Sequence, residues 1–94
     1  MDYLSTKWQK LRQKALRRDG YKCQICNRYG KQKQATTVHH VNPVEHYPDL
    51  QYVLNNLISL CDGCHNKCHD RATHELTAMG KQLQERINKK YNIS

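Results

Sequence analysis

Phenylalanine is absent from this chain of 94 residues, and hydrophobic residues of all kinds make up only 37% of it. No apolar run approaches the roughly 20 residues that a membrane-spanning helix needs, and the mean hydropathy is −0.99. A chain of this length is near the size at which an apolar core alone leaves little stability, so a bound metal is a useful supplement. We therefore expect one small soluble domain with a modest core and a structural metal.

Acidic side chains are also scarce. The chain has eight Asp and Glu and sixteen Lys and Arg, which gives a formal net charge of +8. A positive field over so short a chain favours a polyanionic partner, nucleic acid above all. Residues 5–18 are predicted to form a helix capped by Ser5, with Trp8 and Ala15 on its apolar face. Its basic face is predicted either to contact the DNA backbone or to be plain solvated surface. The basic residues of this helix are Lys7, Lys10, Arg12, Lys14, Arg17 and Arg18.

The cysteines are few but regularly spaced, with one Cys-x-x-Cys pair at Cys23 and Cys26 and a second at Cys61 and Cys64. The first five residues contain no apolar signal segment, so we expect a reducing compartment and metal ligands rather than disulfides. Four thiolates give zinc a closed tetrahedral shell. Buried free cysteines and an iron-sulfur electron carrier are the alternatives. Cys68 is predicted to be either a substitute ligand or a small buried apolar residue.

Histidines gather around two predicted elements. His39 and His40 lie near the end of a predicted strand over residues 36–41, which ends at Asn42 and Pro43, while His65 and His69 are spaced by one helical turn in a predicted helix over residues 64–71. If the strand packs beside the helix, one of the adjacent pair can share a metal with His65 while the other acts as a base. The other two histidines, His46 and His74, are interpreted as ordinary surface or core residues.

The remaining segments are read more coarsely. Residues 23–26 are predicted to form a tight turn, and residues 44–55 a mostly irregular connection, either with or without a short turn of helix. Residues 57–60 are predicted to form a second short strand, followed by a turn at 62–63. A last helix is predicted to be capped by Thr73 and to bury Leu76, Met79, Leu83 and Ile87.

Three stretches together resemble the HNH endonuclease family, the ββα-metal (His-Me finger) nucleases. They are residues 38–43 with the adjacent histidines, residues 56–61 with Asn56 ahead of the second strand, and Cys64 with His65. The flanking Cys-x-x-Cys pairs are similar to those of small bacteriophage and prophage members. The resemblance covers roughly residues 8–71, because the Trp-x-x-Leu-Arg segment that begins at Trp8 and leads into residues 18–23 is also typical of these proteins.

The resemblance implies roles for individual residues. His40 would be the general base, His39 and His65 ligands of a catalytic divalent ion, and Asn56 the residue that fixes the loop beside the base. His69 matches a position that is a further metal ligand in some members and not in others. Because His39 stands where a carboxylate is often found, the ion is left open among Mg²⁺, Mn²⁺, Ni²⁺, Co²⁺ and Zn²⁺, of which imidazole suits magnesium least.

The fold implied is α+β, a single zinc-stapled nuclease domain over residues 1–94. It would divide into a basic N-terminal helix at 1–20, the zinc site and ββα-metal core at 21–71, and a C-terminal helix at 72–94. The expected activity is metal-dependent cleavage or nicking of DNA that leaves 5′-phosphate and 3′-hydroxyl ends. The resemblance also implies the cytoplasm of a bacterial host cell and a phage terminase or packaging partner. A non-catalytic zinc-ribbon DNA-binding module is the alternative function.

Overall fold

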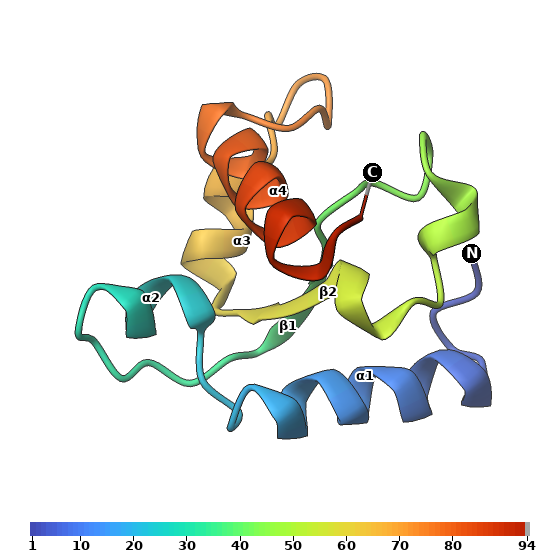
Figure 1. The fold of residues 1–94 in the computed structure, drawn as a ribbon, viewed down its shortest axis with the longest axis horizontal. Coiled ribbons are helices and arrows are strands. Elements are labelled where there is room, and N and C mark those ends of the chain that lie inside the picture. The colour runs from blue at the N-terminus through green and yellow to red at the C-terminus, as the bar shows by residue number, and fades with distance from the viewer. Residues whose placement is uncertain (94) are drawn as a thin grey trace.

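Two short antiparallel strands lie at the centre of the fold, with helices packed against both faces (Figure 1). The computed structural model describes residues 1–93. Strand β1 (Thr37–His40) pairs with β2 (Leu57–Leu60), and His39 lies opposite Ile58 while His40 lies opposite Leu57. The expected α+β fold with a ββα core is confirmed. None of the described helices is long and apolar enough to cross a membrane.

The alternation of side chains along the strands divides the core into two parts. Ile58 packs in the larger part with Leu83 and Ile87 of helix α4 (Ala78–Tyr91). Leu57, its neighbour, packs in the smaller part against Trp8 and Ala15 of helix α1 (Thr6–Arg18). Adjacent residues of β1 therefore also face different helices.

Helix α1 forms as its sequence predicts. The Ser5 hydroxyl accepts a hydrogen bond from the Trp8 backbone N–H at 3.2 Å, and such a cap is worth about 0.5–2 kcal/mol. The helix ends at Asp19, whose N–H donates to the Ala15 carbonyl. The buried residues of the helix are Trp8, Ala15 and Leu16.

Several predicted boundaries are corrected. The first cysteine pair belongs to a short helix, α2 (Gln24–Arg28), rather than to a turn, with Cys23 as its N-cap and Cys26 within it. The connection after β1 contains two short helical turns of the 3-10 type, η1 (Pro48–Leu50) and η2 (Leu54–Asn56), in agreement with the expectation that allowed helical structure there. Helix α3 (Asp62–Cys68) begins two residues earlier and ends three residues earlier than predicted. It starts early because the Cys61 sulfur caps it by accepting from the Cys64 N–H.

The last helix begins after Thr77 and not after Thr73. Residues 69–76 instead form a closed turn in which the Asp70 N–H donates to the Glu75 carbonyl and His69 bridges Leu76. This turn places Leu76 ahead of the helix. Gly80 lies within α4 and does not interrupt the helix. A glycine is required there, since a Cβ atom would collide with the backbone carbonyl oxygen of Cys68.

Candidate active site

Four cysteines from two distant segments meet beside the sheet. The sulfur atoms of Cys23, Cys26, Cys61 and Cys64 all lie within 4.8 Å of one another. The sulfur of Cys26 is 3.9 Å from that of Cys61 and 3.6 Å from that of Cys64. A tetrahedral zinc shell with Zn–S bonds of about 2.3 Å has S–S edges of about 3.8 Å, so the group fits one zinc ion.

Backbone N–H groups orient two of these sulfurs, and the surroundings shift the pKa values of Cys61 and Cys64 in opposite directions, since burial raises that of Cys64. The Cys23 sulfur accepts from the Cys26 N–H and the Cys61 sulfur from the Cys64 N–H, both at 3.5 Å. Burial raises the pKa of the Cys61 thiol, but hydrogen bonds from Cys64, Cys23 and Cys26 outweigh it and bring that pKa to about 7. Cys68 lies outside this group and is fully buried in the larger core, as an apolar residue would be.

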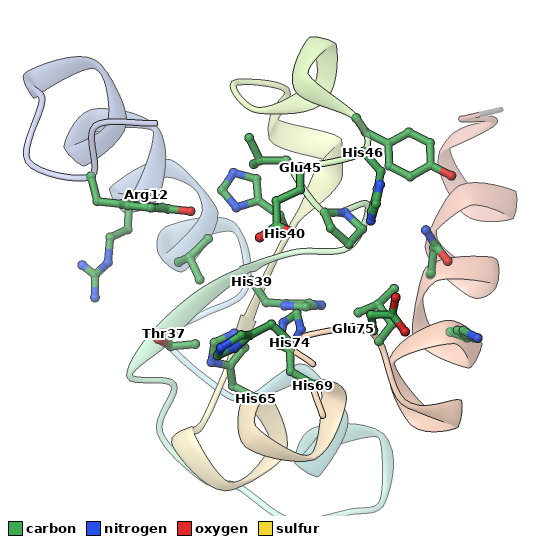
Figure 2. A pocket seen from close by; sticks show the side chains of 18 of the residues that line it. Arg12, Thr37, His39, His40, Glu45, His46, His65, His69, His74 and Glu75 are labelled. Atoms are coloured by element: carbon green, nitrogen blue, oxygen red, sulfur yellow. The ribbon is translucent and has the colours of Figure 1, made fainter. Parts of the chain in front are cut away.

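Three histidines form a second group. The rings of His39, His65 and His69 lie 5.1 to 5.2 Å apart, centroid to centroid, and one nitrogen of each lies within 4.8 Å of the others. Figure 2 shows His39 pointing from β1 toward His65 and His69. Three imidazoles facing one point hold a cation while leaving coordination positions open, as catalytic sites require.

The state of His39 supports a cation in this group. The side chain is 2% exposed, and its Nε2 atom is buried without a hydrogen-bond partner. A buried polar atom without a partner is costly, and a metal ion would satisfy it. Burial, together with His65 and His69, lowers the pKa of His39 to about 3, which keeps the ring neutral and able to ligate.

His69 reaches the group from outside the helix. Helix α3 ends at Cys68, and His69 has an extended backbone at the helix end. Its bridge to Leu76 holds it there. The expected helical spacing of His65 and His69 on one helix is therefore wrong, although the two rings do come together.

His40 points the other way, toward α1. Its ring is stacked on that of Trp8, with centroids 5.0 Å apart and planes 20° apart, and its Nε2 lies 3.0 Å from the Gln51 carbonyl oxygen. Because a carbonyl only accepts, Nε2 carries the hydrogen of the neutral ring and Nδ1 keeps a free lone pair. Burial lowers the pKa of His40, an effect that the Gln51 carbonyl partly opposes.

Asn56 is completely buried and uses its whole amide. Its Oδ1 accepts from the backbone N–H of Asn42 and from the Asn42 side chain, both at 2.9 Å. Its Nδ2 donates to the backbone carbonyls of Asn42 and Leu50, at 3.2 and 3.1 Å. Asn56, at the end of the connection that follows β1, thus binds the start of that connection at Asn42 and its middle at Leu50.

A cavity of about 700 Å³ wraps around the edge of β1 and is lined by all six histidines of the chain. His46 and His74, which the sequence indicated were ordinary surface or core residues, are exposed and line its outer part with Glu45 and Glu75 (Figure 2). Trp8 lines it too, although helical spacing indicated only a core residue. The Gln51 carbonyl leaves no mark in the sequence, because any residue supplies one.

The basic residues of α1 divide into three groups. Arg12 is half-buried and lines the cavity. The Arg18 guanidinium is used internally, since it pairs with Asp19 and donates to the backbone carbonyls of Leu54 and Leu57. The others are exposed at the surface, and the Lys7 ammonium lies 4.1 Å from the centre of the Tyr52 ring. These exposed residues are Lys7, Lys10, Lys14 and Arg17.

Two antiparallel strands followed by a helix, with histidines from strand and helix gathered for one cation, define a ββα-metal site. A sequence model of HNH endonucleases matches residues 23–71, more than half of the chain, and the chain belongs to the HNH endonuclease family. The HNH endonuclease of the deep-sea thermophilic bacteriophage GVE2, solved with a manganese ion, has a similar structure. It is 26% identical, with a TM-score of 0.66 over 98% of this chain and 82% of that one. No curated protein matches the chain.

Proposed function

We propose that this protein is a divalent-metal-dependent DNA endonuclease or nickase that hydrolyses phosphodiester bonds. The observation that carries this proposal is the position of His40 and His39 on either side of one strand at the rim of one cavity. One ring is free to take a proton, and the other faces a three-histidine group. Family membership and the manganese in the bacteriophage GVE2 enzyme agree with it.

His40 is proposed as the general base. Its Nδ1 would take the proton from the water that attacks the phosphorus, while the Gln51 carbonyl holds the hydrogen on Nε2. The Trp8 ring, stacked on His40, prevents the imidazole from turning away from the cavity. The ring is neutral near pH 7 because burial disfavours its charged form.

His39, His65 and His69 would hold the catalytic cation. When bound there, a divalent cation neutralises charge that grows on the scissile phosphate and the leaving oxygen. An all-imidazole group favours Mn²⁺, Co²⁺, Ni²⁺ or Zn²⁺ over Mg²⁺. Cys23, Cys26, Cys61 and Cys64 would hold a separate structural zinc, which has no open position for substrate.

DNA is the proposed substrate, bound mainly through its backbone. The net charge of +8 supplies a sequence-independent attraction, and Arg12 and Lys81 place positive charge at two sides of the cavity. The proposed products carry 5′-phosphate and 3′-hydroxyl ends. We further propose that residues 1–94 act as one nuclease domain in a bacterial cytoplasm, alongside phage or prophage DNA-packaging proteins.

A supercoiled-plasmid assay over a panel of Mg²⁺, Mn²⁺, Ni²⁺, Co²⁺ and Zn²⁺ tests the proposal. We expect nicked or linear product with at least one of these ions. His40→Ala should keep the fold and lose about a hundredfold or more in rate, the usual contribution of a general base. His46→Ala, which removes another imidazole of the same cavity, is the matched control. DNA that is bound but left uncut with every ion would instead favour a zinc-ribbon binding module.

A further inference from the structure

Four amide side chains join the C-terminal helix to the connection beside His40. Asn42 lies at the centre and is 1% exposed. Its Nδ2 donates to Oδ1 of Asn56 at 2.9 Å and to Oδ1 of Asn88 at 2.8 Å. Its Oδ1 accepts from Nε2 of Gln84 at 2.9 Å and from Nδ2 of Asn88 at 3.2 Å. Gln84 and Asn88 are one helical turn apart on α4.

Every hydrogen-bonding position of the Asn42 amide is therefore used. A primary amide offers two N–H donors and two acceptor positions, and Asn42 makes two bonds through each atom. Asn88 bonds Asn42 reciprocally, once as donor and once as acceptor, which fixes the relative orientation of the two amides. A buried polar network in which each member is satisfied specifies one arrangement, and a partly satisfied one does not.

The network continues to the proposed base. Asn56 donates to the backbone carbonyl of Leu50, and the next residue, Gln51, supplies the carbonyl that bonds His40 Nε2. Asn42 is also the second residue after His40, the last residue of β1. The amides of α4 thus hold the chain that carries the base and the carbonyl that orients it.

We propose that Gln84 and Asn88 are positioning residues for His40, acting through Asn42 and Asn56. This inference rests on the proposed function, since it assigns a role in the same reaction. Both residues lie on α4, beyond the segment 23–71 that the family model matches. The C-terminal helix would then contribute to the rate of cleavage as well as to the core.

The expected effect follows from what each substitution removes. Asn88→Ala deletes two bonds to Asn42 and leaves parts of its buried amide unpaired, so the connection is free to shift. A displacement of about 1 Å in a catalytic group can cost about a hundredfold in rate. We expect Asn88→Ala to slow cleavage by about tenfold, which is less than that figure because the shift of the connection would be smaller than about 1 Å. Gln84→Ala deletes only one bond and should slow cleavage less.

The test is a double-mutant cycle on single-turnover cleavage of duplex DNA with Mn²⁺. Asn88→Ala and Gln84→Ala are each measured in the unmodified chain and in His40→Ala. Gln82→Ala removes an exposed amide from the same helix and is the matched control, with no change expected. If the amides act through His40, both losses should disappear in the His40→Ala background, where only slow residual cleavage remains.

Two further measurements separate positioning from general damage. Mn²⁺ affinity, measured by electron paramagnetic resonance, should be unchanged in both variants because the amides of Gln84 and Asn88 bond Asn42, whereas His39 faces His65 and His69. Gln84→Ala keeps the reciprocal amide pair, so it provides a folded variant if Asn88→Ala unfolds.

Equal losses in the two backgrounds, or full activity in both variants, would overturn the inference and leave the nuclease intact. An unmodified chain that cuts no DNA with any ion would overturn the proposed function and this inference with it.

Discussion

His39 and His40 are neighbours in the chain but belong to different environments. Successive strand residues point to opposite faces, so His39 meets His65 and His69 while His40 meets Trp8. Inserting or deleting one residue ahead of them would exchange the two faces. The proposed division between a ligand and a base is thus a property of the strand as much as of the two residues.

The position of His69 is the least expected in the histidine group, because His69 lies outside α3, the helix that carries His65. We predict that His69→Ala weakens Mn²⁺ binding by about a hundredfold or more, since altering even an outer-shell partner typically costs about 10–100-fold. Isothermal titration with Mn²⁺ measures this directly. His74→Ala, which removes a ring from the outer cavity, should bind Mn²⁺ as the unmodified chain does. Equal affinity in His69→Ala would leave only His39 and His65 as ligands.

The helices show what the sequence can and cannot predict. Helix α1, both strands and the grouping of the four cysteines are predicted because regular apolar spacing, β-branched residues and paired cysteines are local signals. The start of α4 is not predicted, because Thr73 and Thr77 are equally good caps and only the turn closed by Asp70 and Glu75 selects the second. The amides around Asn42 are missed as well, since contacts among residues so distant in the chain leave no periodic pattern.

Helix α1 gives a prediction about DNA binding. Arg12→Gln should reduce the slope of log affinity against log salt by about 1, the effect of losing one phosphate contact. Arg18→Gln should leave that slope unchanged, because its guanidinium bonds Asp19 and two backbone carbonyls. It should instead destabilise the fold by about 1–3 kcal/mol, the usual cost of losing hydrogen bonds to a charged group.

Fluorescence anisotropy of labelled duplex DNA at several salt concentrations, combined with urea unfolding, measures both quantities. Lys14→Gln removes an exposed positive charge from the same helix and shows how much of the slope comes from the general field alone. A salt slope that falls in Arg18→Gln but not in Arg12→Gln would contradict the assignment.

Cysteine side chains make up a large part of the main hydrophobic core of the molecule. The larger core contains Cys23, Cys61 and Cys64 among its buried residues, next to Leu83 and Ile87 of α4. The apolar side chains buried with them are aliphatic, and the chain has no phenylalanine. A zinc ion held by the four cysteines would therefore stabilise the sheet, helices α2 and α3, and the packing of α4 against this core.

We predict that removal of zinc unfolds the whole chain. Structural zinc contributes on the order of 10 kcal/mol in small domains, more than such a core can replace. Circular dichroism after chelation, with metal content verified, should show loss of helix, and Cys26→Ala should behave alike. Cys68→Ala, which removes a buried sulfur outside the four-cysteine group, should keep zinc and remain folded. Full helix content in verified zinc-free protein would contradict this.

The placement of the histidines has a practical result. All six line the same cavity, and the chain has no others. Every imidazole ring signal in a nuclear magnetic resonance spectrum therefore originates there, without isotope labelling of chosen sites. A paramagnetic ion bound by the inner three rings would broaden their signals most and those of His46 and His74 to degrees set by distance. The signals of six histidine rings therefore report whether a metal ion is bound, which histidines bind it and whether substrate enters the cavity.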